Sequence, residues 1–459
     1  MLSENTVKKI LEHGLKQGAD FTEVFVEDTV SSSINLLDHK IDEINSSNSF
    51  GIGIRLLYGN EAYYGYTSDT EESKLLKLTG NLGQSGIDRQ SGGVHQLENQ
   101  SVEDIHHVVI NPETVSKSER AELLRNLDKI TRSHSQDICQ VNANMSEKKR
   151  SVLIANSEGL WSEDTRSYSR MRLSAVADKG DGPQSAAESP GVLGGYEFFK
   201  NLDLEKLADN AAQSALRMAS AGYINGGILP VVLGNGFGGV IFHEACGHPL
   251  ETEAIRKNAS PFCDKIGMEV GKPILTAIDD GTLPNKWGSC NVDDEGTPTQ
   301  KTVLIEKGIL KNYLSDRIGA GQVGIPRSGS ARRESYKFAP VSRMRNTFIS
   351  PGSDSVDEMI QSIDFGLYAK KMGGGSVNPG TGEFNFAVQE GYAIRKGKIA
   401  EPVRGATLIG KGFEILPQIS MIADDLDLAA GMCGAASGWV PTTVGQPTLK
   451  IDSILVGGR

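Results

Sequence analysis

The chain has 459 residues, enough for two or three domains, and its 38% hydrophobic and 23% charged residues are typical of a folded globular protein. Its net charge of −11 argues against a general nucleic-acid binder, which would be basic. No run of 18 apolar residues is present, the first residues lack an apolar signal core, and five cysteines are too few for a disulfide framework. We therefore expect no membrane span and a cytoplasmic location.

The first half of the chain, residues 1–222, is predicted to be a mixed α/β domain. Apolar positions recur at helical spacing in some segments, and β-branched and aromatic runs mark others. The predicted elements are an N-terminal helix capped by Ser3, strands 21–28, 51–58 and 61–67, a helix at 118–134, strands 139–145, 150–156 and 168–178, and a helix at 203–220. Short connections join the last three strands, which predicts an antiparallel meander.

The second half, residues 223–459, is predicted to be β-rich and connected by hairpins. A short apolar strand at 228–233 leads through a glycine-rich turn at 234–239 into a helix. Two hairpins follow, with Lys-Gly turns at 307–308 and 396–397. Hairpin-connected strands favour an α+β fold over a parallel doubly wound sheet. The predicted domains are therefore residues 1–222 and 223–459.

One short motif carries most of the chemical information. His243, Glu244 and His248 place a carboxylate between two imidazoles, which suggests a metal site with an adjacent general base. The five-residue step between the histidines lands about 140° round an ideal helix, so a straight helix cannot present both to one ion. A π-bulge absorbs one extra residue, and Pro249 already disturbs the helix. We predict a bulge or kink between Ala245 and Pro249.

A third ligand has to come from elsewhere, and spacing alone leaves several candidates open. Cys433 lies among small residues, which let the backbone approach an ion closely. Cys246 is three residues after His243 and shares its helix face, so it is an alternative to His248 as ligand. The other candidates are Cys263, Cys290, Asp279, Asp280, Asp293 and Asp294.

Five segments in the same order resemble the TldD/PmbA family of metalloproteases. They are the glycine-rich turn with His243-Glu244-x-x-x-His248, residues 342–347, residues 373–386, residues 431–434 and residues 444–448. The loop after Gly434 departs from the family pattern, because it reads Ala-Ala-Ser-Gly-Trp where a Lys-x-Gly-Gln stretch is common.

The resemblance implies a fold, a metal and an activity. The fold would be the two-part α+β architecture of the family, and the metal would be Zn²⁺ held by His243, His248 and Cys433. Glu244 would act as general base in hydrolysing peptide bonds of short or unfolded polypeptides. The intact motif resembles the catalytic, TldD-like subunit. Such a subunit would form a homodimer, or a heterodimer with a motif-free PmbA/TldE-like homologue.

Two regions are candidates for substrate contacts. Gly373, Gly374 and Gly375 could let an extended peptide lie against a strand, although glycines in such a run also mark a plain turn. The basic segment 327–345, with Arg343 and the adjacent Asn346, could bind carboxylates of a peptide. A basic run of this kind is more often a solvated face or a loop.

Three other functions remain open at this point. The chain could be a non-catalytic peptide-binding subunit with a structural metal, which needs a fourth protein ligand such as Cys246. It could be a thiol enzyme in which Cys246 is paired with a histidine base. The basic segment also suggests nucleic-acid binding, although the net negative charge argues against it.

Overall fold

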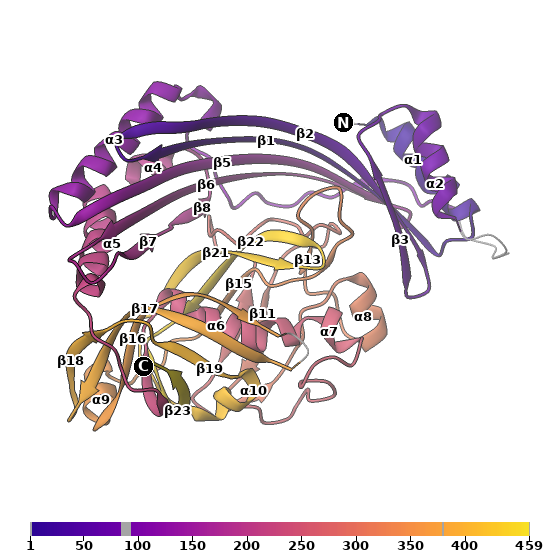
Figure 1. Ribbon diagram of the computed structural model, residues 1–459. Coiled ribbons are helices and arrows are strands. Elements are labelled where there is room, and N and C mark those ends of the chain that lie inside the picture. The colour runs from indigo at the N-terminus through magenta and orange to yellow at the C-terminus, as the bar shows by residue number, and fades with distance from the viewer. Residues whose placement is uncertain (1, 84–92, 379–380, 459) are drawn as a thin grey trace.

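The first part of the chain forms a long, curved and mostly antiparallel sheet that arches over the second part (Figure 1). The computed structural model describes residues 2–83, 93–378 and 381–458. The strand order is β3-β2-β1-β5-β6-β4, with β7 and β8 also paired to β6. The strands are β1 (Phe21–Leu37), β2 (Lys40–Tyr58), β3 (Glu61–Thr67), β4 (Glu98–Asn99), β5 (Ile138–Asn156), β6 (Leu160–Ala177), β7 (Gln184–Glu188) and β8 (Gly191–Leu193).

Helices cover the two ends of this sheet and leave its middle free. At one end α1 (Glu4–Lys16) and α2 (Glu72–Leu82) pack on an apolar cluster that includes Val24 and Ile54. At the other end α3 (Lys117–Ser133) and α5 (Leu204–Ala219) cover a second cluster, and the short α4 (Glu197–Asn201) lies beside them. Between the two clusters the sheet carries mainly polar residues on both faces. The predicted cap of the first helix is confirmed, since Ser3 Oγ accepts the N–H of Thr6 at 3.2 Å.

The predicted three-stranded meander is wrong. Residues 139–145 and 150–156 belong to one continuous strand, β5, which pairs with both β1 and β6 over its length. The polar stretch 146–149 looked like a connection, but its side chains alternate between the two faces of the sheet as a strand requires. The predicted strand 61–67 is β3, and the other predicted strands of this half are parts of longer strands. The predicted helices at 118–134 and 203–220 are confirmed within one residue.

The second part contains two further sheets and a short strand pair, β13 (Ala331–Arg332) with β14 (Val341–Ser342). The six-stranded sheet comprises β10 (Ala277–Asp280), β11 (Lys301–Glu306), β12 (Ile309–Leu310), β15 (Asn346–Ile349), β21 (Asp427–Ala435) and β22 (Gly438–Gln446). The seven-stranded sheet comprises β9 (Gly227–Leu233), β16 (Phe365–Val377), β17 (Glu383–Arg395), β18 (Lys398–Val403), β19 (Thr407–Lys411), β20 (Ile419–Ile422) and β23 (Leu449–Gly457). Strand β16 pairs with both β9 and β17, which closes this sheet on itself.

Short helices connect these strands, and the main apolar core lies between the two sheets. The helices are α6 (Val240–Phe242), α7 (Thr252–Ile255), α8 (Arg317–Val323), α9 (Val356–Gln361) and α10 (Gly412–Ile415). The α+β prediction and the two hairpins with Lys-Gly turns are confirmed. Within the described residues, no helix has the length and apolar character needed to cross a membrane. The boundary at residue 222 stays a prediction; it falls between the end of α5 at Ala219 and the start of β9 at Gly227.

Candidate metal centre

The motif lies on a helical turn that is wider than an α-helix. After α6 the backbone forms a π-helical turn over His243–Gly247 and then a 3-10 turn over His248–Leu250. This confirms the predicted distortion between Ala245 and Pro249. The second histidine comes five positions after the first, and in the π turn the centroids of the two imidazole rings lie 5.1 Å apart. The five-residue spacing is therefore compatible with one shared ion, because a π turn accommodates the extra residue.

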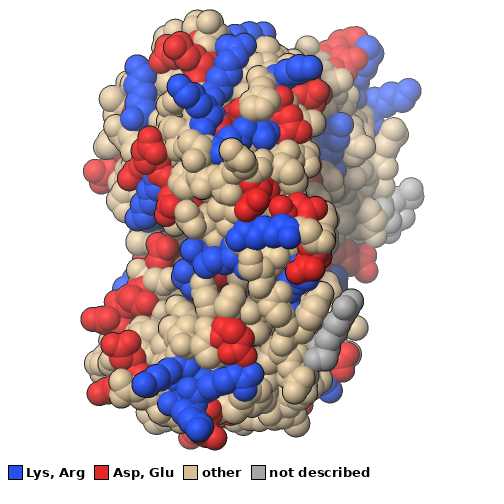
Figure 2. Space-filling model, turned by 60° about the vertical axis from the view of Figure 1, so that its left-hand side comes forward, with Lys and Arg blue, Asp and Glu red and all other residues tan. Residues whose placement is uncertain are grey.

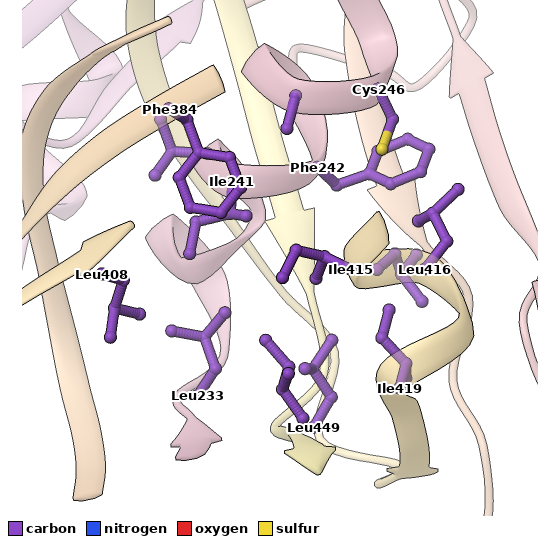
Figure 3. Close-up of a cluster of buried hydrophobic side chains, with 14 of the residues drawn as sticks. Leu233, Ile241, Phe242, Cys246, Phe384, Leu408, Ile415, Leu416, Ile419 and Leu449 are labelled. Atoms are coloured by element: carbon purple, nitrogen blue, oxygen red, sulfur yellow. The ribbon is translucent and has the colours of Figure 1, made fainter. Parts of the chain in front are cut away.

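The turn is anchored from its other side by the apolar core (Figure 3). Ile241, Phe242 and Cys246 point into a cluster that includes Ile415 and Leu416. The backbone of α10 approaches the π turn closely at Gly412, where an added Cβ would lie 1.8 Å from the carbonyl oxygen of Ala245. Close packing against α10 thus holds the position of the π turn and, with it, the two imidazoles.

Three potential ligand atoms converge at one point. The Sγ atom of Cys433 lies 3.2 Å from Nε2 of His243 and 3.1 Å from Nε2 of His248. All three residues are less than a tenth exposed, and their ligand atoms lie within 4.8 Å of one another. In the part of the chain that the structure describes, this is the one group of His, Cys, Asp or Glu residues found to have such geometry. Two imidazoles and a thiolate suit zinc, and a set of three leaves a position for water or substrate.

The surroundings of Cys433 favour the thiolate, which is the form that binds metals. Burial raises the pKa of the Cys433 thiol, but the two neighbouring imidazoles lower it by more, so the pKa lies well below its usual value. Strand β21 carries Cys433, and the guanidinium of Arg343 fixes this strand near its turn. It donates to the carbonyl of Cys433 at 2.7 Å and to that of Gly438 at 3.0 Å.

Two carboxylates flank the imidazole of His248, and they differ in exposure. Glu244 Oε2 lies 3.6 Å from Nε2, the ring atom that faces Cys433, and the Glu244 side chain is 25% exposed. Glu251 is buried and lies on the other side of the ring, with Oε2 3.0 Å from Nδ1. Its second oxygen accepts the N–H of Met344 at 3.1 Å. Glu251 therefore orients the ring, whereas Glu244 has both solvent access and proximity to the ligand atoms.

Sequence reasoning missed Glu251. It is three residues after His248, a spacing that places two side chains on one face of a helical turn. A carboxylate partner for the second nitrogen of a metal-binding histidine is common, so this spacing was a usable signal.

The alternative ligands lie elsewhere. Cys246 is buried in the apolar core, and burial raises the pKa of its thiol strongly. This environment does not support Cys246 as the fourth ligand of a closed site or as a reactive nucleophile. Cys290 donates to the carbonyl of Val292, and Asp279 accepts from Arg345 N–H and the Thr347 hydroxyl. The remaining candidates, Cys263, Asp280, Asp293 and Asp294, are not part of the group.

The predicted substrate contacts separate into two kinds. Gly373 and Gly374 line a groove of about 870 Å³ between the two parts of the chain, whereas Gly375 is exposed but does not line it. Pro379 and Gly380, in the same resembling segment, lie outside the described residues. The opposite wall includes β21 up to Met432, the residue before Cys433. The groove therefore runs along the strand that carries Cys433.

Arg343 and Asn346 are buried, and their side chains bind other parts of the protein. Asn346 is fully buried, and its amide donates to the carbonyl of Asp280 and to Ser289 Oγ. Arg343 is 1% exposed, and its guanidinium donates hydrogen bonds to carbonyls of the β21–β22 hairpin. Because both side chains are buried, neither is accessible to a peptide, and they act on the site by positioning its strands.

The expectation of a solvated basic segment at 327–345 is wrong for most of its arginines. Arg332, Arg333, Arg343 and Arg345 are all at least 95% buried. Arg333 donates to Glu23 Oε1 at 2.7 Å and thereby joins the second part of the chain to β1. Because these arginines are buried, the basic segment no longer supports nucleic-acid binding. Figure 2 shows basic and acidic side chains intermixed on the face that it presents.

Comparison with known proteins gives matches along nearly the whole chain. Profiles for the PmbA/TldA metallopeptidases match as domain 1 over residues 22–81, as the central domain over 110–219 and as the C-terminal domain over 226–458. The chain is 37% identical to a metalloprotease TldD homolog of Haemophilus influenzae and 34% identical to one of Buchnera aphidicola subsp. Acyrthosiphon pisum. Both alignments cover all of this chain and 97% or 96% of the relative.

A solved structure shows the same fold. TldE from Thermococcus kodakarensis superposes with a TM-score of 0.77 at 19% identity, and the match covers 99% of this chain and 100% of that one. At this identity the likeness supports the architecture described above.

Proposed function

The chain belongs to the PmbA/TldA metallopeptidase family, and on this premise we propose that it is a zinc-dependent peptidase in which Glu244 is the general base. The observation that carries the proposal is the convergence of His243, His248 and Cys433 beside the partly exposed carboxylate of Glu244. The donor set of two imidazole nitrogens and one sulfur favours zinc over magnesium or calcium, which prefer oxygen ligands.

Each residue has a distinct role in this proposal. The ion, when bound, supplies a Lewis acid that polarises the scissile carbonyl and lowers the pKa of water at the site. Glu244 accepts a proton from the attacking water and passes it to the leaving amine, as general acid–base catalysis requires. Glu251 keeps Nδ1 of His248 protonated and Nε2 free to bind. Arg343 holds the carbonyl of Cys433 and so fixes the strand that bears the sulfur.

The groove between the two parts of the chain fits an extended polypeptide. It is bounded by Gly373 and Gly374 of β16 on one side and by β21, the outer strand of its sheet, on the other. A strand at a sheet edge can bind a peptide through main-chain hydrogen bonds, which are independent of sequence. We infer that short or unfolded polypeptides in the cytoplasm are the substrates, because a folded domain does not present a free extended segment.

A non-catalytic subunit with a structural metal is less well supported. Structural zinc sites have four protein ligands, and the nearest candidate for a fourth, Cys246, points into the apolar core. An open site with an adjacent carboxylate is typical of catalytic zinc. We also infer that the active form is a dimer, either of this chain or with a TldE-like subunit, which native mass spectrometry of the purified protein can distinguish.

Glu244→Gln tests the role of the base, with Glu253→Gln as matched control. Glu253 is bonded to Arg256 and Lys257 and does not contact the ligands. We expect Glu244→Gln to keep its zinc and lose at least about 100-fold in hydrolysis of unfolded polypeptide, within the range that general acid–base catalysis supplies. The control variant should keep both. Peptidase activity retained in zinc-loaded Glu244→Gln would refute the assignment.

A further inference from the structure

A second cavity, next to the large groove, contains charge that the proposed chemistry does not use. This slot, of about 330 Å³, lies between the inner face of the N-terminal sheet and the β21–β22 hairpin. Arg170 and Met432 line both the slot and the groove, so the two spaces adjoin. A polypeptide bound in the groove could therefore extend into the slot.

The sheet wall of the slot is polar and basic because of strand alternation. Ser31, Lys148 and Tyr168 are neighbours in register across β1, β5 and β6, and Ser33, Ser146 and Arg170 form a second such row. These side chains share one face of the sheet. Glu147 and Lys149, the residues on either side of Lys148 in β5, point to the opposite face.

Lys148 and Arg170 are the two cations of this wall that no carboxylate neutralises. The ammonium group of partly buried Lys148 has no hydrogen bond or ion pair within the described part of the chain. Arg170 donates to Ser189 Oγ at 3.0 Å and to the carbonyl of Ala430 at 3.3 Å, but to no acid. Burial lowers the pKa of both groups, and the neighbouring Arg150 and Arg172 lower them further. Glu27, Glu334 and Asp294 act in the opposite direction on Lys148, but its pKa stays below the usual value.

Within the described residues, the acids that line the slot form no hydrogen bond or ion pair with Lys148 or Arg170. Asp294 is bound by Arg166 at 2.6 Å, and Glu334 accepts the N–H of Trp439 at 2.8 Å. Glu147 is paired with Arg120 on the other face of the sheet. An anion that entered the slot would meet Lys148 and Arg170 without displacing an internal partner.

On the opposite side of the slot, the β21–β22 hairpin contributes exposed apolar side chains beside Arg332, Arg333 and Arg345. Met432 and Trp439 are 43% and 60% exposed, and both belong to the hairpin that carries Cys433. A slot that combines these apolar side chains with the cations of the sheet wall suits a carboxylate next to an apolar side chain. The carboxylate gains a charged hydrogen bond, and the apolar side chain is buried.

We propose that this slot is a specificity subsite that binds a carboxylate of the polypeptide substrate, with Lys148 and Arg170 as its anchors. The inference rests on the proposed peptidase function and adds a preference to it. Such a carboxylate can come from an acidic side chain or from the C-terminus of the chain, and the test separates these sources.

The test measures binding, so it does not depend on turnover. Zinc-loaded Glu244→Gln protein would be titrated calorimetrically with three acetylated peptides of one Ala/Leu sequence: one with a central Glu and an amidated C-terminus, one with Gln in its place, and the Gln peptide with a free C-terminus. We expect at least one carboxylate peptide to bind about tenfold more tightly than the neutral one, as a charged hydrogen bond implies. An advantage of the Glu peptide identifies a side chain, and an advantage of the free acid identifies the chain end.

The variants assign the effect to the slot. Added to the Glu244→Gln background, Lys148→Gln or Arg170→Gln should reduce the preference to less than about threefold, whereas Lys149→Gln, on the opposite face, should leave it unchanged. Equal binding of all three peptides, or a preference that survives both substitutions, would overturn the proposal. If the unmodified protein hydrolyses peptides without any charge preference, this inference fails while the proposed function stands. A preference without hydrolysis would retain the subsite and refute the function.

Discussion

The hydrogen bond between Glu251 and His248 should control how tightly the metal is held. The Oε2 atom of Glu251 lies 3.0 Å from Nδ1 of His248, and its Oε1 atom accepts the N–H of Met344 at 3.1 Å. Glutamine has nearly the same shape but only one accepting oxygen. In Glu251→Gln the amide oxygen can satisfy one of these donors, and the NH₂ group then faces the other donor in a buried position. The imidazole of His248 should therefore be less well oriented and less basic.

Loss of such a carboxylate partner typically weakens metal binding by about 10- to 100-fold, or about 1.4 to 2.7 kcal/mol. We expect a zinc dissociation constant raised by this factor in Glu251→Gln, measured by competition with a chromophoric chelator. Glu253→Gln removes an acid two residues away that is bonded to Arg256, and its affinity should match that of the unmodified protein. An unchanged affinity in Glu251→Gln would show that His248 is not a ligand through Nε2, and the assigned geometry would be refuted.

Two further substitutions test the support of the site and the joining of the two parts of the chain. In Gly412→Ala the new methyl group would collide with the carbonyl of Ala245 in the π turn, so we expect a loss of about 1–3 kcal/mol in unfolding free energy together with weaker zinc binding. Unfolding free energies would be measured by chemical denaturation. Gly321→Ala, on α8 with open space around it, should leave this free energy unchanged or raise it. Equal unfolding free energies of the two variants would contradict the packing argument. The fully buried side chain of Glu390 joins α5 to the second part of the chain through Arg217. Burial raises the pKa of Glu390, but hydrogen bonds that include those from Lys370 and Tyr392 lower it to about 2. Since the folded state favours the charged form, Glu390 should stabilise the protein by about 2–3 kcal/mol above pH 5, and this contribution should vanish as the pH falls from about 5 to 2. Urea unfolding of the unmodified protein and Glu390→Gln across this range measures it, and a difference between the two that does not depend on pH would argue against this linkage.

The sequence predicted the local geometry of the motif because local rules govern it. Two histidines five residues apart cannot share an ion on a regular α-helix, and Pro249 precludes a regular helix there. The π turn over His243–Gly247 satisfies both constraints. Likewise, a serine before an amphipathic run predicted the cap of α1, and Lys-Gly pairs predicted two hairpin turns.

Features that depend on distant partners could not be read in this way. The polar stretch 146–149 is typical of a connection, and it continues β5 because β1 and β6 pair with it on both sides. The basic segment 327–345 is typical of a solvated loop, and Arg333 is buried because Glu23, more than 300 residues earlier, meets it at 2.7 Å. Cys433 was one of several candidate ligands on sequence grounds, since only the β21–β22 hairpin brings it to the two imidazoles.

The metal content of the purified protein tests the central claim most directly. Zinc per chain would be measured by mass spectrometry on protein purified without a metal-binding tag, beside Cys433→Ala and the matched control Cys246→Ala. Our account predicts about one zinc per chain in the unmodified protein and in Cys246→Ala, and loss of that zinc in Cys433→Ala, because Cys433 is the only one of the two thiols near the imidazoles. Zinc retained in Cys433→Ala but lost in Cys246→Ala would contradict the assignment of the third ligand, and absence of metal from all three proteins would contradict the metal centre itself.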